Sequence, residues 1–210
     1  LIPLGYNKPN DVRKEDDGMF HKGLSREALI DAAKRLIEES GVSAFSMRTL
    51  ADKLGVKAAS LYAHIESMDA LFTEVGLSAL NDQKAAQLFA VQGEKRDQAV
   101  MALADSYRAF AKEHSELYRL IMQMPMGNNE ALKTAAAMTA EPVMQVLADY
   151  SISVERRMHW QRVLRGVMHG FASQEAAGYF SHYPVALEES YHLAIHCVID
   201  GLHGEEASNE

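Results

Sequence analysis

Residues 46–65 read SMRTLADKLGVKAASLYAHI, and the positions of the small and apolar side chains predict two short helices that cross at a tight turn. Ala51 is a small residue within the first helix, where the second helix must approach closely. Gly55 follows four residues later, and glycine reaches the positive φ of such a turn at little cost. The apolar positions that lock the two helices together are Leu50, Leu54, Val56 and Leu61. This pattern is typical of a helix–turn–helix, whose second helix enters the DNA major groove.

The segment before this motif predicts a third helix over residues 25–40, because its apolar side chains recur with i, i+3, i+4 spacing. These are Leu29, Ala32, Ala33, Leu36 and Ile37. Ser25 is the expected N-cap, and Gly41 is the expected C-terminal stop. Ser46 is the expected cap of the next helix, with Phe45 and Leu50 as a hydrophobic staple. The sequence therefore predicts a three-helix DNA-binding head over residues 24–84.

The rest of the chain also predicts helices, because no stretch alternates with a period of two between turn signals. Pro142 lies inside one of these segments and predicts a kink or a split there. The fold class is therefore all-α, with a flexible leader over residues 1–23 and a helical bundle over residues 85–210. The expected helices cover 68–90, 96–114, 116–123, 129–149, 154–179 and 185–202.

The composition indicates a soluble globular protein, with 48% hydrophobic and 24% charged residues in a chain of 210. No run approaches the ~18 apolar residues of a membrane helix. Cys197 is the only cysteine, so an internal disulfide is impossible and a cytoplasmic location is expected. We interpret Cys197 as a small buried residue in a helix rather than a redox sensor.

The charge of the chain is not that of a simple basic DNA binder, because the formal net charge is −8. Residues 21–70 hold seven Lys and Arg against seven Asp and Glu, and most of the negative excess lies after residue 70. The cations that matter are therefore expected on one face, with Arg48, Lys53 and Lys57 near the groove. We expect salt-sensitive, modest affinity from each subunit and tight binding only from a dimer.

Individual DNA contacts follow from the place of each residue in the motif. Ser46, Arg48 and Thr49 begin the first motif helix, where hydroxyl and backbone N–H groups suit a phosphate oxygen. A capping role for Ser46 is compatible with this contact. The second helix opens with Lys57, which can donate to guanine, and its first turn continues with Ala58, Ala59 and Ser60 at the base edges.

The motif also resembles the DNA-binding head of tetracycline-repressor (TetR) family regulators, and the resemblance covers roughly residues 24–84. Its core is Gly55-Val56 followed by Leu61-Tyr62-Ala63-His64, and Asp69-Ala70-Leu71 closes it. The resemblance implies that Tyr62 and His64 contact phosphates, the alternative for Tyr62 being packing against the first motif helix. Met68 departs from the family, which usually has Lys there, so that backbone contact is in doubt.

A second resemblance covers about residues 156–202 and concerns the last two helices of one subclass of the family. It implies a homodimer that pairs through about 154–179 and 185–202, with an effector pocket lined by the helices before them. The residues that carry it are Trp160, Arg165, His169-Gly170-Phe171, Glu175, Gly178, Phe180 and Asp200-Gly201-Leu202.

The pocket itself is indicated only by composition, since methionine and aromatic side chains adapt to an apolar ligand. Glu175 could pair with a cationic group of the effector, or with Arg165 or a neighbouring subunit. Ordinary core packing is the alternative for each of the others. The candidate ligand-binding residues are Met101, Tyr107, Phe110, Met122, Met138, Trp160, Met168, Phe171 and Glu175.

An enzyme is not expected, because no phosphate loop, nucleophile elbow or spaced cysteine cluster is present. His192 and His196 have the i, i+4 spacing of a zinc pair, but the segment lacks the Glu beside the first ligand. We therefore expect no catalytic residues, no metal and no cofactor.

The sequence predicts a repressor that binds a palindromic operator in double-stranded DNA as a dimer and is released by a small apolar or amphipathic effector. The alternative is a ligand-independent or partner-regulated DNA-binding protein whose C-terminal bundle only dimerises. An enlarged apolar cavity within residues 96–180 would favour the repressor, and a fully packed bundle would favour the alternative.

Overall fold

The structure is a computed structural model that describes residues 24–124 and 129–208, and within these ranges every regular element is helical. The predicted leader, residues 1–23, lies outside the described residues. The elements in chain order are α1 (Arg26–Ser40), the 3₁₀ helix η1 (Val42–Ala44), α2 (Met47–Leu54), α3 (Ala58–Leu61), α4 (Met68–Ala90), α5 (Arg96–Glu113), α6 (Ser115–Gln123), α7 (Glu130–Met138), α8 (Glu141–Leu147), α9 (Val154–Ala176) and α10 (Leu187–Ala207).

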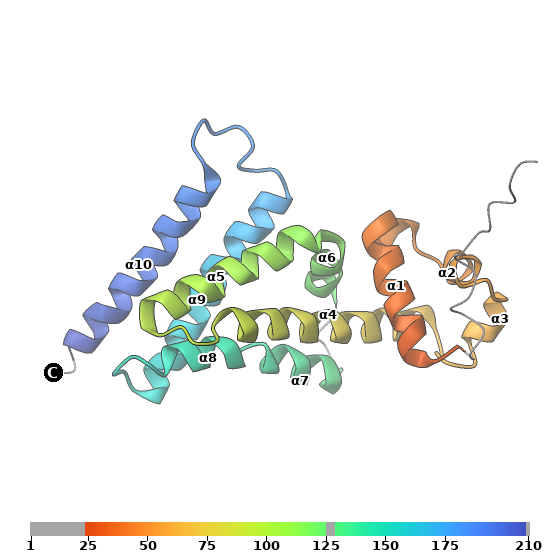
Figure 1. Cartoon of the computed structure of the whole chain (residues 1–210), viewed down its shortest axis with the longest axis horizontal. Helices are drawn as coiled ribbons and strands as arrows, with labels where there is room; N and C mark the ends of the chain where they lie inside the picture. The colour runs from red at the N-terminus through yellow and green to blue at the C-terminus, as the bar shows by residue number, and fades with distance from the viewer. Residues whose placement is uncertain (1–23, 125–128, 209–210) are drawn as a thin grey trace, which may run out of the picture.

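The helices form two parts, a head made of α1, α2 and α3 and a body made of α5 to α10 (Figure 1). The long helix α4 leaves the head and runs through the body, where it packs against α5, α6 and α7. This helix is continuous across the expected domain boundary at residue 84, so one uninterrupted helix joins the two parts. The predicted all-α fold, with a helix–turn–helix head followed by a bundle, is confirmed. No helix in the described ranges combines the length and the apolar composition needed to cross a bilayer.

The helix starts and stops in the head lie where the sequence predicts them. The Ser25 hydroxyl accepts a hydrogen bond from the Ala28 N–H at 3.1 Å, which caps α1. Gly41 ends that helix with a φ of 81°, a conformation that side chains with a Cβ rarely adopt. Ser67 caps α4 by accepting from the Ala70 N–H at 3.0 Å. Hydrogen bonds between residues a few positions apart therefore define the ends of these helices.

The body corrects several sequence predictions at the ends of its helices. The segment 129–149 is two helices, and Pro142 lies in the first turn of α8, where its missing N–H has no partner to lose. The predicted split is thus confirmed, but the break precedes the proline. The helix expected to reach residue 179 ends at Ala176, and the last helix extends to Ala207 instead of 202.

The last helix also corrects the prediction that Cys197 is buried, because this side chain is exposed. Tyr191, Ile195 and Ile199 bury the inner face of α10 against the body. Cys197 lies two positions after Ile195, on the opposite side of the helix. The rotation of α10 about its axis, which composition does not set, decides which side chains face solvent.

Candidate nucleic-acid interface and effector site

The turn between α2 and α3 has the geometry that the sequence predicts for a helix–turn–helix. Gly55 is left-handed with a φ of 67°, and the following Val56 N–H donates to the Ala51 carbonyl at 3.0 Å. Ala51 is buried at the crossing, and Leu50 and Leu61 are fully buried beneath it. The absence of a Cβ at Gly55 and the small side chain at Ala51 let the two helices meet closely.

The N-terminus of α2 carries three of the predicted phosphate contacts. Ser46 and Thr49 form a capping box, in which the Ser46 hydroxyl accepts from the Thr49 N–H at 3.1 Å and the Thr49 hydroxyl accepts from the Ser46 N–H at 2.9 Å. Arg48 is exposed and has no ion-pair partner among the described residues. The cap fixes the position of the first turn, and Arg48 extends from it into solvent.

The start of α3 carries the predicted base contacts. Lys57 is the N-cap residue of this four-residue helix, and its side chain is exposed without an ion pair in the described part of the chain. Ala59 and Ser60 are exposed as well, whereas Ala58 is half-buried and packs against the core of the head. The open side of α3 is therefore formed by Lys57, Ala59 and Ser60.

Two further residues follow α3 on the chain and lie beside this open side. Tyr62 is 53% exposed, so its ring does not fill the space against α2 that the alternative interpretation gave it. His64 is half-buried and lines a polar groove together with Tyr62. Lys53, which the sequence analysis placed near the DNA major groove, instead forms an ion pair with Glu39 of α1. The exposed, unpaired cations of the motif are thus Arg48 and Lys57.

Seven of the nine predicted effector residues lie on α5 and α9, two helices that pack against each other at the centre of the body. Tyr107 and Phe110 of α5 and Met168 of α9 are buried. Phe171 is half-buried, and its ring lies 5.4 Å from that of Tyr191. Glu175 receives two hydrogen bonds from Arg108 at 2.7 and 2.9 Å, so the predicted pairing with Arg165 is wrong.

The remaining four predicted effector residues are Met101 and Trp160, at other positions of α5 and α9, and Met122 and Met138, on other helices. Met122 and Met138 are exposed on α6 and α7. Met101 is half-buried and lines a groove between α5 and α10. Trp160 packs on α10 at Gly201. A Cβ atom added to this glycine would lie only 2.4 Å from the Cη2 atom of the indole ring. These four side chains do not share one site.

The centre of the body contains a chain of polar groups that the sequence analysis missed. The Tyr118 hydroxyl lies 3.1 Å from the Tyr107 hydroxyl and 2.6 Å from His169 Nδ1. Burial raises the pKa of both Tyr107 and Tyr118, so both phenols stay protonated as donors. A consistent assignment has Tyr107 donating to Tyr118, which donates to Nδ1 of His169. The three groups satisfy one another and need no ligand.

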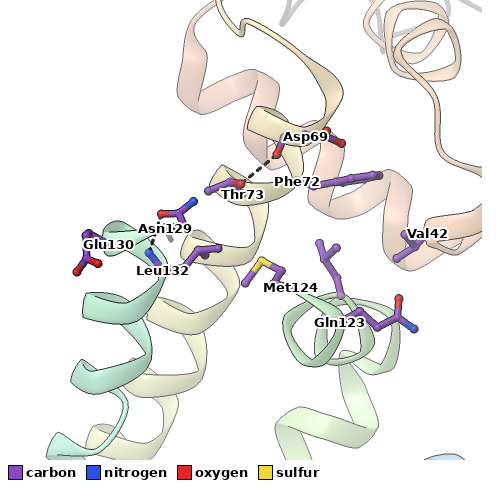
Figure 2. A pocket seen from close by; sticks show the side chains of 10 residues that line it. Val42, Asp69, Phe72, Thr73, Gln123, Met124, Asn129, Glu130 and Leu132 are labelled. Carbon is purple, nitrogen blue, oxygen red and sulfur yellow. Dashed lines mark hydrogen bonds between the residues drawn. The ribbon is translucent and has the colours of Figure 1, made fainter. Parts of the chain in front are cut away.

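A cavity of about 930 Å³ lies elsewhere, at the junction of head and body (Figure 2). We call it the junction cavity. None of its ten lining residues was among the predicted effector residues, because they are far apart in sequence and no helical periodicity links them. They are Val42, Asp69, Phe72, Thr73, Leu120, Gln123, Met124, Asn129, Glu130 and Leu132.

Comparison with known proteins agrees with this architecture. Residues 29–75 match the family model described as bacterial regulatory proteins, tetR family, and residues 100–198 match the tetracyclin repressor-like C-terminal domain. The chain is similar to an uncharacterised HTH-type transcriptional regulator of Mycobacterium tuberculosis, with 31% identity over 156 residues that cover 74% of this chain and 72% of the relative.

Two solved structures show the same fold. A Rhodococcus sp. RHA1 protein of unknown function matches 88% of this chain and 98% of its own, with a TM-score of 0.74 and 24% identity. A TetR protein of Acinetobacter baumannii AYE in complex with minocycline matches 88% of this chain and 99% of its own, with a TM-score of 0.66 and 18% identity. From the matched head, the matched C-terminal domain and the relative of similar length, we conclude that the chain belongs to the TetR family of DNA-binding transcriptional regulators.

Proposed function

We propose that the protein is a dimeric repressor that binds a palindromic operator through α2 and α3 and leaves it when a small apolar or amphipathic molecule binds. Residues 24–84 would form the DNA-binding domain, and residues 85–210 the effector and dimerisation domain. A regulator of this kind acts beside the bacterial chromosome, which gives the cytoplasmic location. The observation that carries the proposal is that Arg48, Lys57 and Tyr62 of the motif are all exposed, and that the two cations have no ion-pair partner among the described residues.

Base and phosphate contacts divide between the two motif helices in this proposal. At the capped N-terminus of α2, Arg48 contacts a DNA phosphate, and Thr49 reaches the same phosphate when its hydroxyl exchanges its hydrogen bond to the Ser46 carbonyl for one to the phosphate. The first turn of α3 presents Lys57 to base edges in the major groove, where a bidentate contact to guanine discriminates by about 1–3 kcal/mol. Ser46 acts mainly by holding α2 in place, and Tyr62 and His64 add backbone contacts beyond α3.

Dimerisation would use the outer faces of α9 and α10. Val163 is 45% exposed on α9 and Leu193 is 66% exposed on α10, so both apolar side chains are accessible to a partner subunit. Gly166 and Gly170 leave open space where a partner helix can approach. Ile195 and Ile199 of α10 are buried inside the subunit, so they do not belong to this outer face.

The fit of Trp160 against Gly201 supports assignment to the subclass whose last two helices carry this pair. The indole ring fills the space that a Cβ on α10 would need, so the two residues belong together. This close approach would set the angle between α9 and α10, and hence the shape of the surface that meets the second subunit.

Release of DNA would then follow from geometry. Two recognition helices in a twofold dimer must lie about one DNA turn apart, ~34 Å, or a multiple of it. Because α4 joins head and body without a break, a ligand that tilts α4 changes this separation. The ligand acts only to the extent that it prefers the state that cannot bind DNA. The Acinetobacter protein in complex with minocycline is a fold relative that holds such a small molecule.

One observation favours the alternative of a ligand-independent DNA-binding protein. Tyr107 and Met168 are packed tightly at the centre of the body, and the polar groups around them pair with one another. If no ligand enters any cavity of the protein, the bundle serves only to dimerise. Thermal-shift screening of a metabolite and drug collection separates the two proposals, because only the first expects a compound that both stabilises the protein and weakens DNA binding.

The DNA-binding assignment is tested with the double variant Lys57→Ala and Tyr62→Ala on DNA selected from a random pool by the unaltered protein. Binding should weaken more than about a hundredfold, because each lost contact costs about 1–3 kcal/mol and occurs in both half-sites. The control is Lys112→Ala with Tyr183→Ala, an exposed pair of the same residue types outside the head and outside the two segments proposed to dimerise. Equal binding by the two double variants would refute the interface.

A further inference from the structure

The junction cavity is bounded by the head on one side and by the body on the other. The head supplies Val42 of η1, and α4 supplies Phe72 in its first turns. The body supplies Leu120 and Met124 at the end of α6 and Leu132 at the start of α7. Figure 2 shows Phe72, Met124 and Leu132 directed into the space between these elements. Residues 125–128, which join α6 to α7, lie outside the described residues.

The size and the lining fit a small organic molecule. A cavity of about 930 Å³ is at the upper end of the range of ligand sites. Its floor consists of the apolar side chains named above, and its rim carries the polar side chains Thr73, Gln123 and Asn129. An apolar floor with a polar rim binds a molecule that has one large apolar part and one polar end.

The charge of the cavity rim decides which charge the polar end of the ligand must carry. Asp69 and Glu130 contribute two carboxylates, and the described lining residues include no Lys, Arg or His. Asp69 forms no ion pair with any described residue. Glu130 pairs with Lys133 at 2.8 Å, but both side chains are exposed, and surface pairs of this kind contribute little. The cavity therefore repels an anion and attracts a cation, and the ring of Phe72 can add a cation–π contact.

The walls of the cavity are connected to the DNA-binding helices. The Phe72 ring lies 5.3 Å from the ring of Phe45, the residue directly before the cap of α2. On the body side, Glu116 of α6 accepts a hydrogen bond from the Val42 N–H at 3.4 Å. Helix α6 thus touches the head at its start and lines the cavity at its end.

Helix α6 also rests on the connecting helix at one close contact. A Cβ at Gly76 of α4 would lie 2.1 Å from the Met124 sulfur atom, so Met124 occupies the space that this glycine leaves. A molecule that displaces Met124 would change the spacing between α6 and α4. Movement at the cavity is therefore transmitted to α2 through Phe72 and along α4 through Met124.

We propose that the junction cavity, and not the packed centre of the body, is the effector site, and that its effector is an amphipathic organic cation. This proposal rests on the proposed function, since it gives the ligand-responsive repressor its site and its ligand class. Asp69 and Glu130 bind the cationic end of the ligand, the apolar floor binds its body, and Phe72 and Met124 move as it enters.

The test uses two probes of the same shape and opposite charge, tetraphenylphosphonium and tetraphenylborate, on the full chain. Isothermal titration should show binding of the cation and none of the anion. The double variant Asp69→Asn with Glu130→Gln should bind the cation about tenfold more weakly or worse, because two charged contacts are lost. The matched control is Glu188→Gln. Glu188 is a carboxylate at the second residue of α10, the position that Asp69 has in α4. This variant should bind the cation as strongly as the unaltered protein does.

DNA binding is measured on the same samples, with operator selected from a random pool, and each variant is compared with itself without probe. The cation should weaken operator binding by the unaltered protein and by Glu188→Gln, and much less by the double variant. Equal binding of both probes, no binding of the cation, or equal affinity of the double variant for the cation overturns the proposed site. If one of these three outcomes is found while the unaltered protein still binds the operator, only the proposed effector site is refuted and the DNA-binding function stands. Loss of operator binding by the unaltered protein would instead refute the proposed function.

Discussion

The contact between Trp160 and Gly201 makes a prediction whose sign and size can be worked out. The change is Gly201→Ala, in the middle of α10. The new Cβ would lie 2.4, 3.1 and 3.3 Å from the Cη2, Cζ3 and Cζ2 atoms of the indole ring, all shorter than a normal carbon contact of ~3.5 Å. A fused ring held between two helices has no flexible end to turn aside, so either α9 or α10 must move.

The expected magnitude comes from comparing this glycine with Gly204, one turn further along the same helix. Replacing either by alanine gains about 1 kcal/mol of helix propensity, but a Cβ at Gly204 meets no atom within 4 Å. The propensity gain cancels in the comparison, and what remains is the overpacking cost of about 1–3 kcal/mol. Gly201→Ala should therefore unfold roughly 3–9 °C below Gly204→Ala, at a few degrees per kcal/mol for a chain of this size.

The assay is thermal unfolding followed by circular dichroism, at one fixed concentration because the proposed dimer makes the midpoint depend on concentration. The control is Gly201→Ala in a Trp160→Leu background, where the ring is gone and the alanine should become stabilising. The reasoning is refuted if Gly201→Ala is as stable as Gly204→Ala while Trp160 is present. A penalty that persists in the Trp160→Leu background would also refute it.

Three further predictions concern the interface, the head and the dependence on pH. Gly166→Ala meets no atom within its own subunit, so it should leave the subunit fold intact but raise the dimer dissociation constant in sedimentation equilibrium; unchanged dimerisation would place the interface elsewhere. Ser46→Ala removes the cap of α2 and should destabilise the head by about 0.5–2 kcal/mol in chemical unfolding, whereas the exposed Ser43→Ala should not. Hydrogen bonding from Arg96 lowers the pKa of Glu206 below its ordinary 4.5, so this carboxylate stabilises the fold above pH 4.5 and the effect is lost as the pH falls through the lowered value. Glu206→Gln should accordingly reduce the unfolding temperature at pH 7 and have little effect near pH 3; an equal loss at both values would contradict the role of the ion pair.

The sequence by itself determined the head, because its structure depends on interactions between residues a few positions apart. A capping hydroxyl at Ser46 acts on the N–H three residues later, and Gly55 adopts its left-handed turn because it lacks a Cβ. The i, i+3, i+4 spacing of apolar residues decides which face of α1 is buried, and the structure buries every residue that the spacing selects. The same local rules separated α7 from α8 near Pro142.

Only the tertiary structure decided which side chains of the body meet. The partner of Glu175 is Arg108, 67 positions earlier, and nothing in the spacing favoured it over Arg165. Cys197 faces solvent because of how α10 is rotated about its own axis. The junction cavity exists because η1, α4, α6 and α7, which come from distant parts of the chain, leave a gap between head and body. Such features depend on the packing of whole helices against each other, and the free energy of that packing depends on shape complementarity, which the order of residues along one helix does not reveal.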